Sequence, residues 1–124
     1  MIDDLYRALA HHMGMEHLNA SEDGRVTLQF ESGDRLRFDV KECGLQISLL
    51  MPTDPVHKAK QQLKALALSP NDLLSQYALR PGLVGQQFIA FHVLLSESQM
   101  QLDHVLLVMD EIREHGKRLE RAMQ

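Results

Sequence analysis

Residues 25–51 alternate between apolar and polar side chains with a period of two, and this pattern constrains the fold more than any other feature of the sequence. Such alternation is typical of strands that bury one face. The apolar positions form three runs: Val26, Leu28 and Phe30; Leu36, Phe38 and Val40; and Leu45, Ile47, Leu49 and Met51. Short segments containing Gly33 or Gly44 separate these runs, so the pattern predicts three antiparallel strands joined by tight turns.

Apolar residues at helical spacing flank the three predicted strands. Ile2, Leu5 and Leu9 share one face of a helix that we expect over about residues 2–14. After the third strand, Asp54 and Pro55 have the pairing that begins a helix. This second helix is predicted to have a polar side that includes Gln61 and an apolar stripe formed by Val56, Ala59, Leu63 and Leu66.

The C-terminal half contains fewer regular patterns. The segment from Arg80-Pro81-Gly82 to Gly85 is predicted to interrupt regular structure, and residues 88–95 are rich in branched and aromatic side chains, which favours a strand. Ser98 and Gln101 have the spacing of a capping box, which predicts a long helix over about residues 99–122. Gly116 lies within that helix and predicts fraying after residue 115.

These elements follow one another in the order α-βββ-α-β(β)-α and predict an α+β fold in a single domain over residues 1–124, a twisted antiparallel sheet with flanking helices. The chain has 17 acidic and 13 basic residues, a formal charge of −4, which argues against a nucleic-acid-binding module and against docking on an anionic membrane. The apolar stretch at 88–95 is too short for membrane insertion. We therefore expect a soluble intracellular protein; the acidic start, Asp3-Asp4, and the lone Cys43 agree.

The residues that commonly carry chemistry show no catalytic or metal-binding pattern. Seven histidines are present, but no two have the i, i+3 or i, i+4 spacing that places two metal ligands on one side of a helix. Cys43 lies in a predicted turn, and Ser96 and Ser98 fit helix caps better than nucleophiles. We predict no enzyme activity, no catalytic residue, no metal and no cofactor. A small His-rich metal- or ligand-binding enzyme is the alternative.

Apolar residues occur at positions where a one-sided sheet should be polar. Leu50 interrupts the alternation of the third strand, and both faces of residues 88–95 are largely apolar. Either another helix of the chain covers these side chains, or they form a patch that binds a partner.

The run Leu79-Arg80-Pro81-Gly82-Leu83-Val84-Gly85, the apolar strand after it, Ser96-Glu97-Ser98 and the final amphipathic helix carry a family resemblance. With the element order, they make the chain resemble the class I type III secretion chaperones of the CesT/SycE-like fold, and among these the SycN-type members that serve YopN-class gatekeeper proteins. The resemblance implies an α-βββ-α-ββ-α order. It also implies a bacterial cytoplasmic chaperone that binds the N-terminal region of a secreted effector or gatekeeper, keeps it secretion-competent and aids its delivery to the export apparatus. A regulatory adaptor is a second alternative.

The resemblance also implies where partners bind. Family members are dimers packed through the second helix and the strand region after it, which implies a homodimer, or a heterodimer with a second small chaperone. The corresponding dimer-interface residues are Val56, Ala59, Leu63, Leu66, Phe88 and Leu94. A client would lie on apolar patches of the first helix and the sheet, or add a strand at a sheet edge. The client-binding candidates in the sheet are Leu28, Phe30, Leu36, Phe38 and Leu50.

Overall fold

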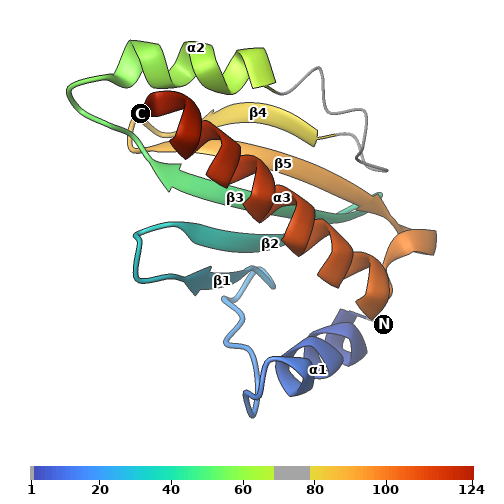
Figure 1. Ribbon diagram of the computed structural model, residues 1–124. Coiled ribbons are helices and arrows are strands. Elements are labelled where there is room, and N and C mark those ends of the chain that lie inside the picture. Colours follow the sequence, from blue (N-terminus) through green and yellow to red (C-terminus); the bar gives the residue numbers. More distant parts are fainter. Residues whose placement is uncertain (1, 69–78) are drawn as a thin grey trace.

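The computed structural model describes residues 2–68 and 79–124 (Figure 1). The helices are α1 (Ile2–His12), α2 (Lys58–Leu68) and α3 (Leu102–Met123), with a short 3₁₀ turn, η2 (Glu97–Gln99), before α3. The strands are β1 (Val26–Gln29), β2 (Arg35–Lys41), β3 (Gly44–Pro52), β4 (Leu79–Val84) and β5 (Phe88–Ser96). All strand pairs are antiparallel, and the sheet order is β1-β2-β3-β5-β4. The predicted α+β class and the three-strand meander are confirmed.

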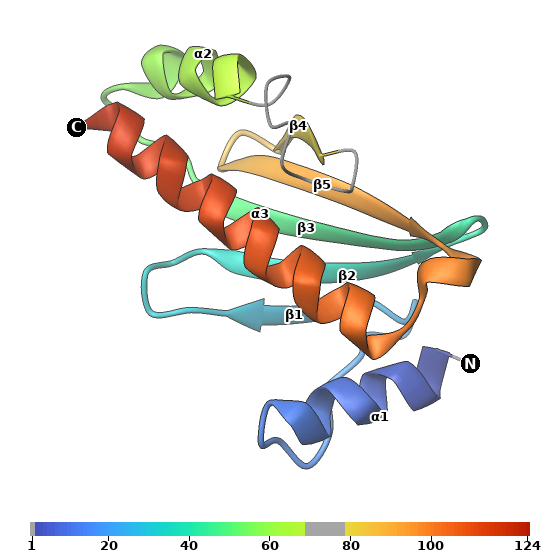
Figure 2. The ribbon, with the colours of Figure 1, turned by 45° about the vertical axis from the view of Figure 1, so that its right-hand side comes forward.

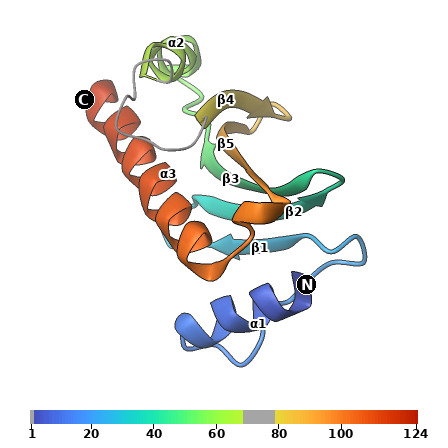
Figure 3. The ribbon, with the colours of Figure 1, turned by 90° about the vertical axis from the view of Figure 1, so that its right-hand side faces the viewer.

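The helices cover the sheet unequally. Helix α3 crosses one face of the sheet diagonally, α1 lies beside the β1 edge, and α2 lies near the β4 edge (Figures 1 and 2). Seen along the sheet, no helix of the described part of the chain covers the other face (Figure 3). We call this uncovered side the open face. None of the helices within 2–68 and 79–124 has the length and apolar content that a bilayer span requires.

The strand register gathers the apolar positions under α3. Leu49 of β3 lies opposite Leu36 of β2 on one side and Phe91 of β5 on the other. All three side chains are buried, as is Ile112 of α3. Because side chains alternate along a strand, the residues between these positions point to the open face, and the core is a single layer between sheet and α3.

The structure corrects the prediction that residues 80–85 interrupt regular structure, because β4 runs from Leu79 to Val84. The Pro81 and Gly82 signals favoured a break. However, β4 lies at the edge of the sheet and pairs only with β5, and edge strands tolerate a proline that cannot donate a hydrogen bond. Gly82 leaves room for a neighbour: a β-carbon at this position would lie 2.9 Å from Nε2 of His92.

The second helix begins later than predicted and packs through a different face. Oδ1 of Asp54 accepts hydrogen bonds from the backbone N–H groups of Val56 (2.9 Å) and His57 (3.1 Å), so Asp54 stabilises a turn before the helix begins at Lys58. Gln61, predicted to face water, is buried instead: Oε1 accepts from the Asp54 backbone N–H at 2.8 Å and Nε2 donates to the Pro52 carbonyl at 3.2 Å. The predicted apolar stripe therefore faces outwards.

The final helix begins three residues later than predicted, at Leu102, and continues to Met123 without fraying after residue 115. Gly116 is buried against β3, where a β-carbon would lie 2.6 Å from Cδ2 of Leu49. The glycine allows α3 to approach the sheet closely, and this packing outweighs its low helix propensity. The predicted capping pair, Ser98 and Gln101, is also wrong. The pair is shifted by two residues: the side-chain oxygen of Gln99 accepts from the Ser96 backbone N–H at 3.1 Å, at the start of η2.

Candidate interaction surfaces

The largest exposed apolar side chains near one sheet edge come from α2 and β4. Leu63 and Leu66 of α2 are 68% and 57% exposed, and Leu83 of β4 is 59% exposed. Between helix and strand lies a cleft of about 170 Å³ whose lining, mostly apolar, includes Ala65, Leu66, Leu83 and Ile89. We call Leu63, Leu66 and Leu83 with this cleft the α2–β4 surface. The sequence did not identify Leu83 as an interface candidate, because residues 80–85 were expected to interrupt regular structure. The available signal was its place in the Leu79–Gly85 run that carries the family resemblance.

The remaining predicted dimer residues are distributed over two places. Val56, in the turn before α2, is 80% exposed, and Ala59 is exposed in the first turn of α2. Leu94 and Phe88 belong to the open face of β5, where Leu94 is exposed and Phe88 is half-buried. The structure thus brings Leu66 together with Leu83 at one cleft, with Leu63 one turn before Leu66 on α2, and places Phe88 and Leu94 on a separate side of the sheet.

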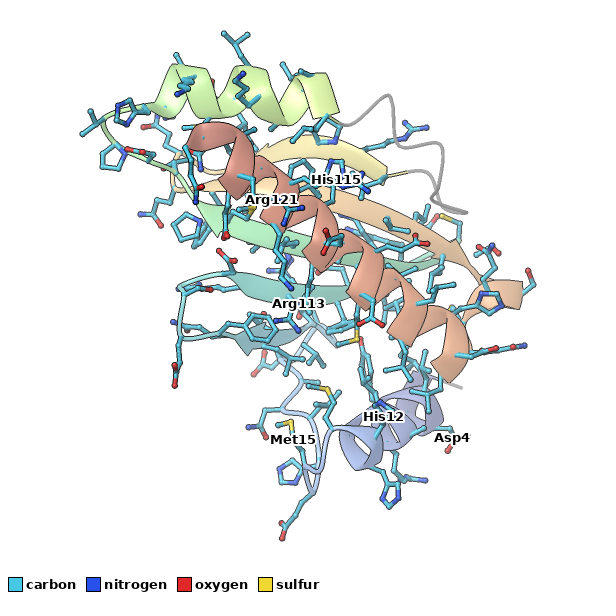
Figure 4. The ribbon with its side chains drawn as sticks, in the orientation of Figure 1. Asp4, His12, Met15, Arg113, His115 and Arg121 are labelled. Carbon is cyan, nitrogen blue, oxygen red and sulfur yellow. The ribbon has the colours of Figure 1, made fainter. Side chains whose placement is uncertain are left out.

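A second candidate surface lies where β1 and β2 are joined. Leu28 and Phe30 are half-buried, and the Arg113 guanidinium lies 4.5 Å from the centre of the Phe30 ring, a cation–π contact. Figure 4 shows Arg113 on the side of α3 that faces β1 and β2. A cleft of about 200 Å³ there is lined by Phe30, Asp34 and Arg113 among others. Burial raises the pKa of the Asp34 carboxyl above its usual value, against the opposing effects of Ser32 and Arg113.

The other three client-binding candidates are not surface residues. Leu36 and Phe38 are fully buried under α3, and Leu50 is only 3% exposed although it points to the open face. Arg35 explains this burial: its guanidinium lies 5.0 Å from the centre of the Phe88 ring. Since β3 separates β2 from β5, the Arg35 side chain must cross β3 and cover Leu50. Of the five candidates, Leu28 and Phe30 are therefore accessible at the surface, and Leu36, Phe38 and Leu50 are not.

The apolar side of α1 is largely used within the chain. Leu5, Tyr6, Leu9 and Ala10 are buried. The Tyr6 hydroxyl donates to the Gly24 carbonyl at 3.2 Å, and burial, with a smaller effect of Asp39, raises the pKa of Tyr6 to about 12. Met15, just after α1, is exposed (Figure 4). The exposed apolar side chain near α1 is therefore Met15, in the segment after the helix.

The histidines do not gather into a metal site. His12 on α1 and His115 on α3 lie far apart (Figure 4). His115 is buried with its ring edge-to-face against Phe91, the two ring centres 4.6 Å apart. His92 lies on the open face, where Nδ1 is 2.7 Å from the Ser48 hydroxyl. Among residues 2–68 and 79–124, no three His, Cys, Asp or Glu side chains are placed to hold one metal ion together.

Comparison with known proteins finds similarity in structure but not in sequence. No protein-family model matches the chain, and no curated protein matches it. A chain of the Yersinia pestis type III secretion chaperone SycH, solved with a stable fragment of YscM2, superposes with a TM-score of 0.71 at 12% identity. The match covers 96% of this chain and 99% of that one.

Two further complexes contain a chain of the same fold. A chain of the ExsC–ExsE complex matches with a TM-score of 0.70 and 13% identity, over 97% of this chain and 91% of that one. A chain of the heterodimeric ExoU–SpcU complex from the type III secretion system of Pseudomonas aeruginosa matches with a TM-score of 0.67 and 20% identity, over 98% and 97%. Over nearly its whole length, this chain has the fold of the type III secretion chaperone SycH.

Proposed function

We propose that this chain is a type III secretion chaperone: a non-enzymatic protein that binds the N-terminal region of a secreted protein in the bacterial cytoplasm, keeps it secretion-competent and aids its delivery to the export apparatus. The observation that carries the proposal is the shared fold, which extends over at least 96% of this chain in three solved structures. All three are complexes with another protein: SycH with YscM2, ExsC with ExsE, and SpcU with ExoU. Protein binding is thus a common property of the proteins that share this fold.

The α2–β4 surface supports the proposal of a dimer. Three leucines that are each more than half exposed are costly to leave in water, and a contiguous apolar patch is typical of an interface. We propose that Leu63, Leu66 and Leu83 form the centre of the seam, with Val56 and Ala59 beside them. Phe88 and Leu94 lie on the open face and outside this seam. The partner is a second copy of this chain or a second small chaperone.

The client is proposed to bind at the β1–β2 end of the sheet. Leu28 and Phe30 offer accessible apolar surface beside the Arg113 cleft. The edge strand β1 is short and pairs with β2 on one side, while Ala20 bridges Val26 on the other. Beyond that bridge, an extended segment could add a strand through main-chain hydrogen bonds. The Leu79–Gly85 run resembles SycN-type chaperones, which makes a gatekeeper protein one proposed class of client.

Co-expression tests the proposal. The gene is expressed together with a secreted protein encoded beside it, and the mixture is separated by size exclusion. We expect a stable complex with the full-length client and with its N-terminal fragment of about 100 residues, a typical domain length. A client that lacks this fragment is the matched control and should not co-elute. If the chain forms no complex with any secreted protein encoded beside it, the result would count against the proposal.

A further inference from the structure

The open face of the sheet carries a strong local excess of positive charge in an otherwise acidic chain. The alternation of strands β2 and β4 directs the side chains of Arg35, Arg37, Lys41 and Arg80 to this side. Arg25, just before β1, joins them through its ion pair with Asp39. Arg25 also pairs with Asp23, at 4.0 Å. Five cations therefore face two carboxylates, a local excess of three positive charges, whereas the whole chain has a charge of −4.

The buried carboxylate of this face, Asp39, is already neutralised. Asp39 is buried, and its two oxygens accept hydrogen bonds from Nε of Arg25 at 2.6 Å and from Nε of Arg37 at 2.9 Å. Across 2–68 and 79–124, no carboxylate forms an ion pair with Arg35, Lys41 or Arg80. The Nε atom of Arg35 is also buried without a hydrogen-bond partner in that part of the chain. The positive charge of this face therefore lacks compensation within the described fold.

The register arranges part of this charge in one row. Arg37, Ser48, His92 and Arg80 lie directly opposite one another on β2, β3, β5 and β4. With neighbouring strands about 4.8 Å apart, the backbones of Arg37 and Arg80 are about 14 Å apart. An extended peptide advances by about 3.4 Å per residue, so two carboxylates four residues apart would be separated by nearly the same distance.

A hollow at one end of the row contains the His92 imidazole beside Arg80. It has a volume of about 600 Å³ and is lined by Gln46, Arg80, Pro81, His92 and Leu94. Nδ1 of His92 is held by Ser48 at 2.7 Å and Gln46 at 3.1 Å. Its other nitrogen, Nε2, lies over Gly82, where a side chain would displace it. The imidazole is thus fixed beside Arg80 by three neighbouring strands.

We propose that the open face binds an extended acidic segment of a partner protein, with carboxylates at alternate positions facing Arg37, His92 and Arg80. Charge complementarity selects this occupant. A single-stranded nucleic acid fits less well, because such sites combine cations with exposed aromatic rings for base stacking, and the ring of Phe88 on this face is covered by Arg35. The inference goes beyond the proposed function, since it holds whether or not the partner is secreted.

His92 makes the binding dependent on pH. Burial, followed by the positive charge of Arg37, lowers the pKa of His92 below its usual value of 6.5; Lys41 acts in the same direction and Asp39 opposes both. From β4, Arg80 faces the ring, while Ser48 and Gln46 of β3 are neutral. A bound carboxylate favours the imidazolium and raises the pKa of His92 in the complex. Binding should therefore tighten as pH falls from about 7.5 to about 5.5, where glutamate stays ionised.

Fluorescence anisotropy with synthetic peptides tests the proposal on the intact chain. The probe is a labelled peptide of about 12 residues that alternates Glu and Ser; the same peptide with Gln for Glu is the uncharged control, and an oligothymidylate of about 12 nucleotides tests the nucleic-acid alternative. We expect binding of the Glu peptide at about 0.1 M salt and loss of binding at about 1 M salt, where screening is strong.

Variants locate the site. Arg80→Gln should lower the affinity for the Glu peptide by about fivefold, which is the upper range for loss of an exposed charge pair. Lys64→Gln on the exposed side of α2 makes the same change in net charge and should have little effect. His92→Gln should remove the pH dependence. Equal affinity for the Glu and Gln peptides, equal effects of Arg80→Gln and Lys64→Gln, or tighter binding of the oligonucleotide would each overturn the proposal. None of these outcomes bears on the co-expression experiment, so the two proposals fail independently.

Discussion

Replacing Leu63 by aspartate should dissociate the proposed dimer while leaving the fold of each protomer intact. Leu63 is 68% exposed on the outer side of α2, so the protomer itself loses little packing. In the proposed dimer, the same side chain lies at the centre of the α2–β4 surface. The substitution therefore separates the two roles that an apolar surface residue can have, packing within the chain and packing against a partner.

The expected loss follows from the exposed fraction of Leu63. Full burial of a leucine side chain contributes about 1.5–3 kcal/mol. Since 68% of Leu63 remains exposed in the protomer, about 1–2 kcal/mol is left to be gained at the interface, or about 2–4 kcal/mol over both copies in a two-fold dimer. A buried carboxylate without a partner adds several kcal/mol. The dissociation constant of the dimer should therefore rise by at least about 100-fold.

Sedimentation equilibrium of the wild type and the Leu63→Asp variant measures this change. Leu107→Asp is the matched control, because Leu107 is 39% exposed on α3 and lies outside the α2–β4 surface. We expect a dimer for the wild type and the control, and a monomer with an unchanged circular dichroism spectrum for Leu63→Asp. An unchanged dimer in Leu63→Asp would refute the assignment of this seam. A wild type that is monomeric at micromolar concentration would exclude the homodimer, and the same comparison would then be made with the second small chaperone present.

Three further substitutions test other parts of the structure. Phe30→Ala should weaken binding of the client's N-terminal fragment about tenfold or more, as measured by calorimetry, because it removes the ring beneath Arg113; an affinity equal to wild type would exclude Phe30 from the client surface. Gly116→Val should lower the free energy of unfolding in urea by about 2 kcal/mol, because its β-carbon would lie 2.6 Å from Leu49; the exposed neighbour variant Lys117→Val should cost less, and equal costs would contradict the close approach of α3. The pKa of Tyr6 is raised to about 12 from 10.0, so the folded state keeps its phenol proton where the unfolded state loses it, and stability should fall as pH rises from 10.0 towards 12. Tyr6→Phe should reduce this fall in urea unfolding midpoints, and an identical fall in the variant would contradict the burial of the hydroxyl.

The sheet was predictable from the sequence where local pattern and final environment agree. The alternation at residues 25–51 correctly predicted β1, β2 and β3. It did not predict that Ser48 and Leu50 are buried on the opposite face, or that Val40 is exposed. The β4 strand was not predictable from its own residues. Pro81 and Gly82 are ordinary turn signals, and only the position of this strand at the sheet edge makes them compatible with pairing.

Packing faces were harder to predict than elements. The stripe of α2 led to the expectation that Gln61 faces water, but its side chain is buried and hydrogen-bonded to Pro52, at the end of β3, and to Asp54, in the loop before α2. Gly116 was interpreted through its helix propensity alone, whereas its role depends on Leu49, which is distant in sequence. Both errors have the same physical origin: tertiary contacts outweigh local preference by more than the 1 kcal/mol or so at stake.

The candidate surfaces were predicted in part. The helical spacing of Leu63 and Leu66 identified residues that are in fact exposed, and Leu28 and Phe30 remain accessible. Leu50 was correctly recognised as an anomaly of the strand pattern, and in the structure it is buried opposite Arg35, whose side chain reaches across β3 to Phe88. A long side chain that crosses a neighbouring strand leaves no signal in sequence periodicity.

Export of the client from the living bacterium is the most direct test of the chaperone proposal. The gene for this chain is deleted, and the amount of the neighbouring secreted protein is measured inside the cells and in the medium. We predict that secretion falls sharply and that a plasmid copy of the wild-type gene restores it, whereas a copy carrying the Phe30→Ala substitution restores it poorly. Undiminished secretion and undiminished intracellular levels of the type III-exported proteins in the deletion strain would contradict the proposed function.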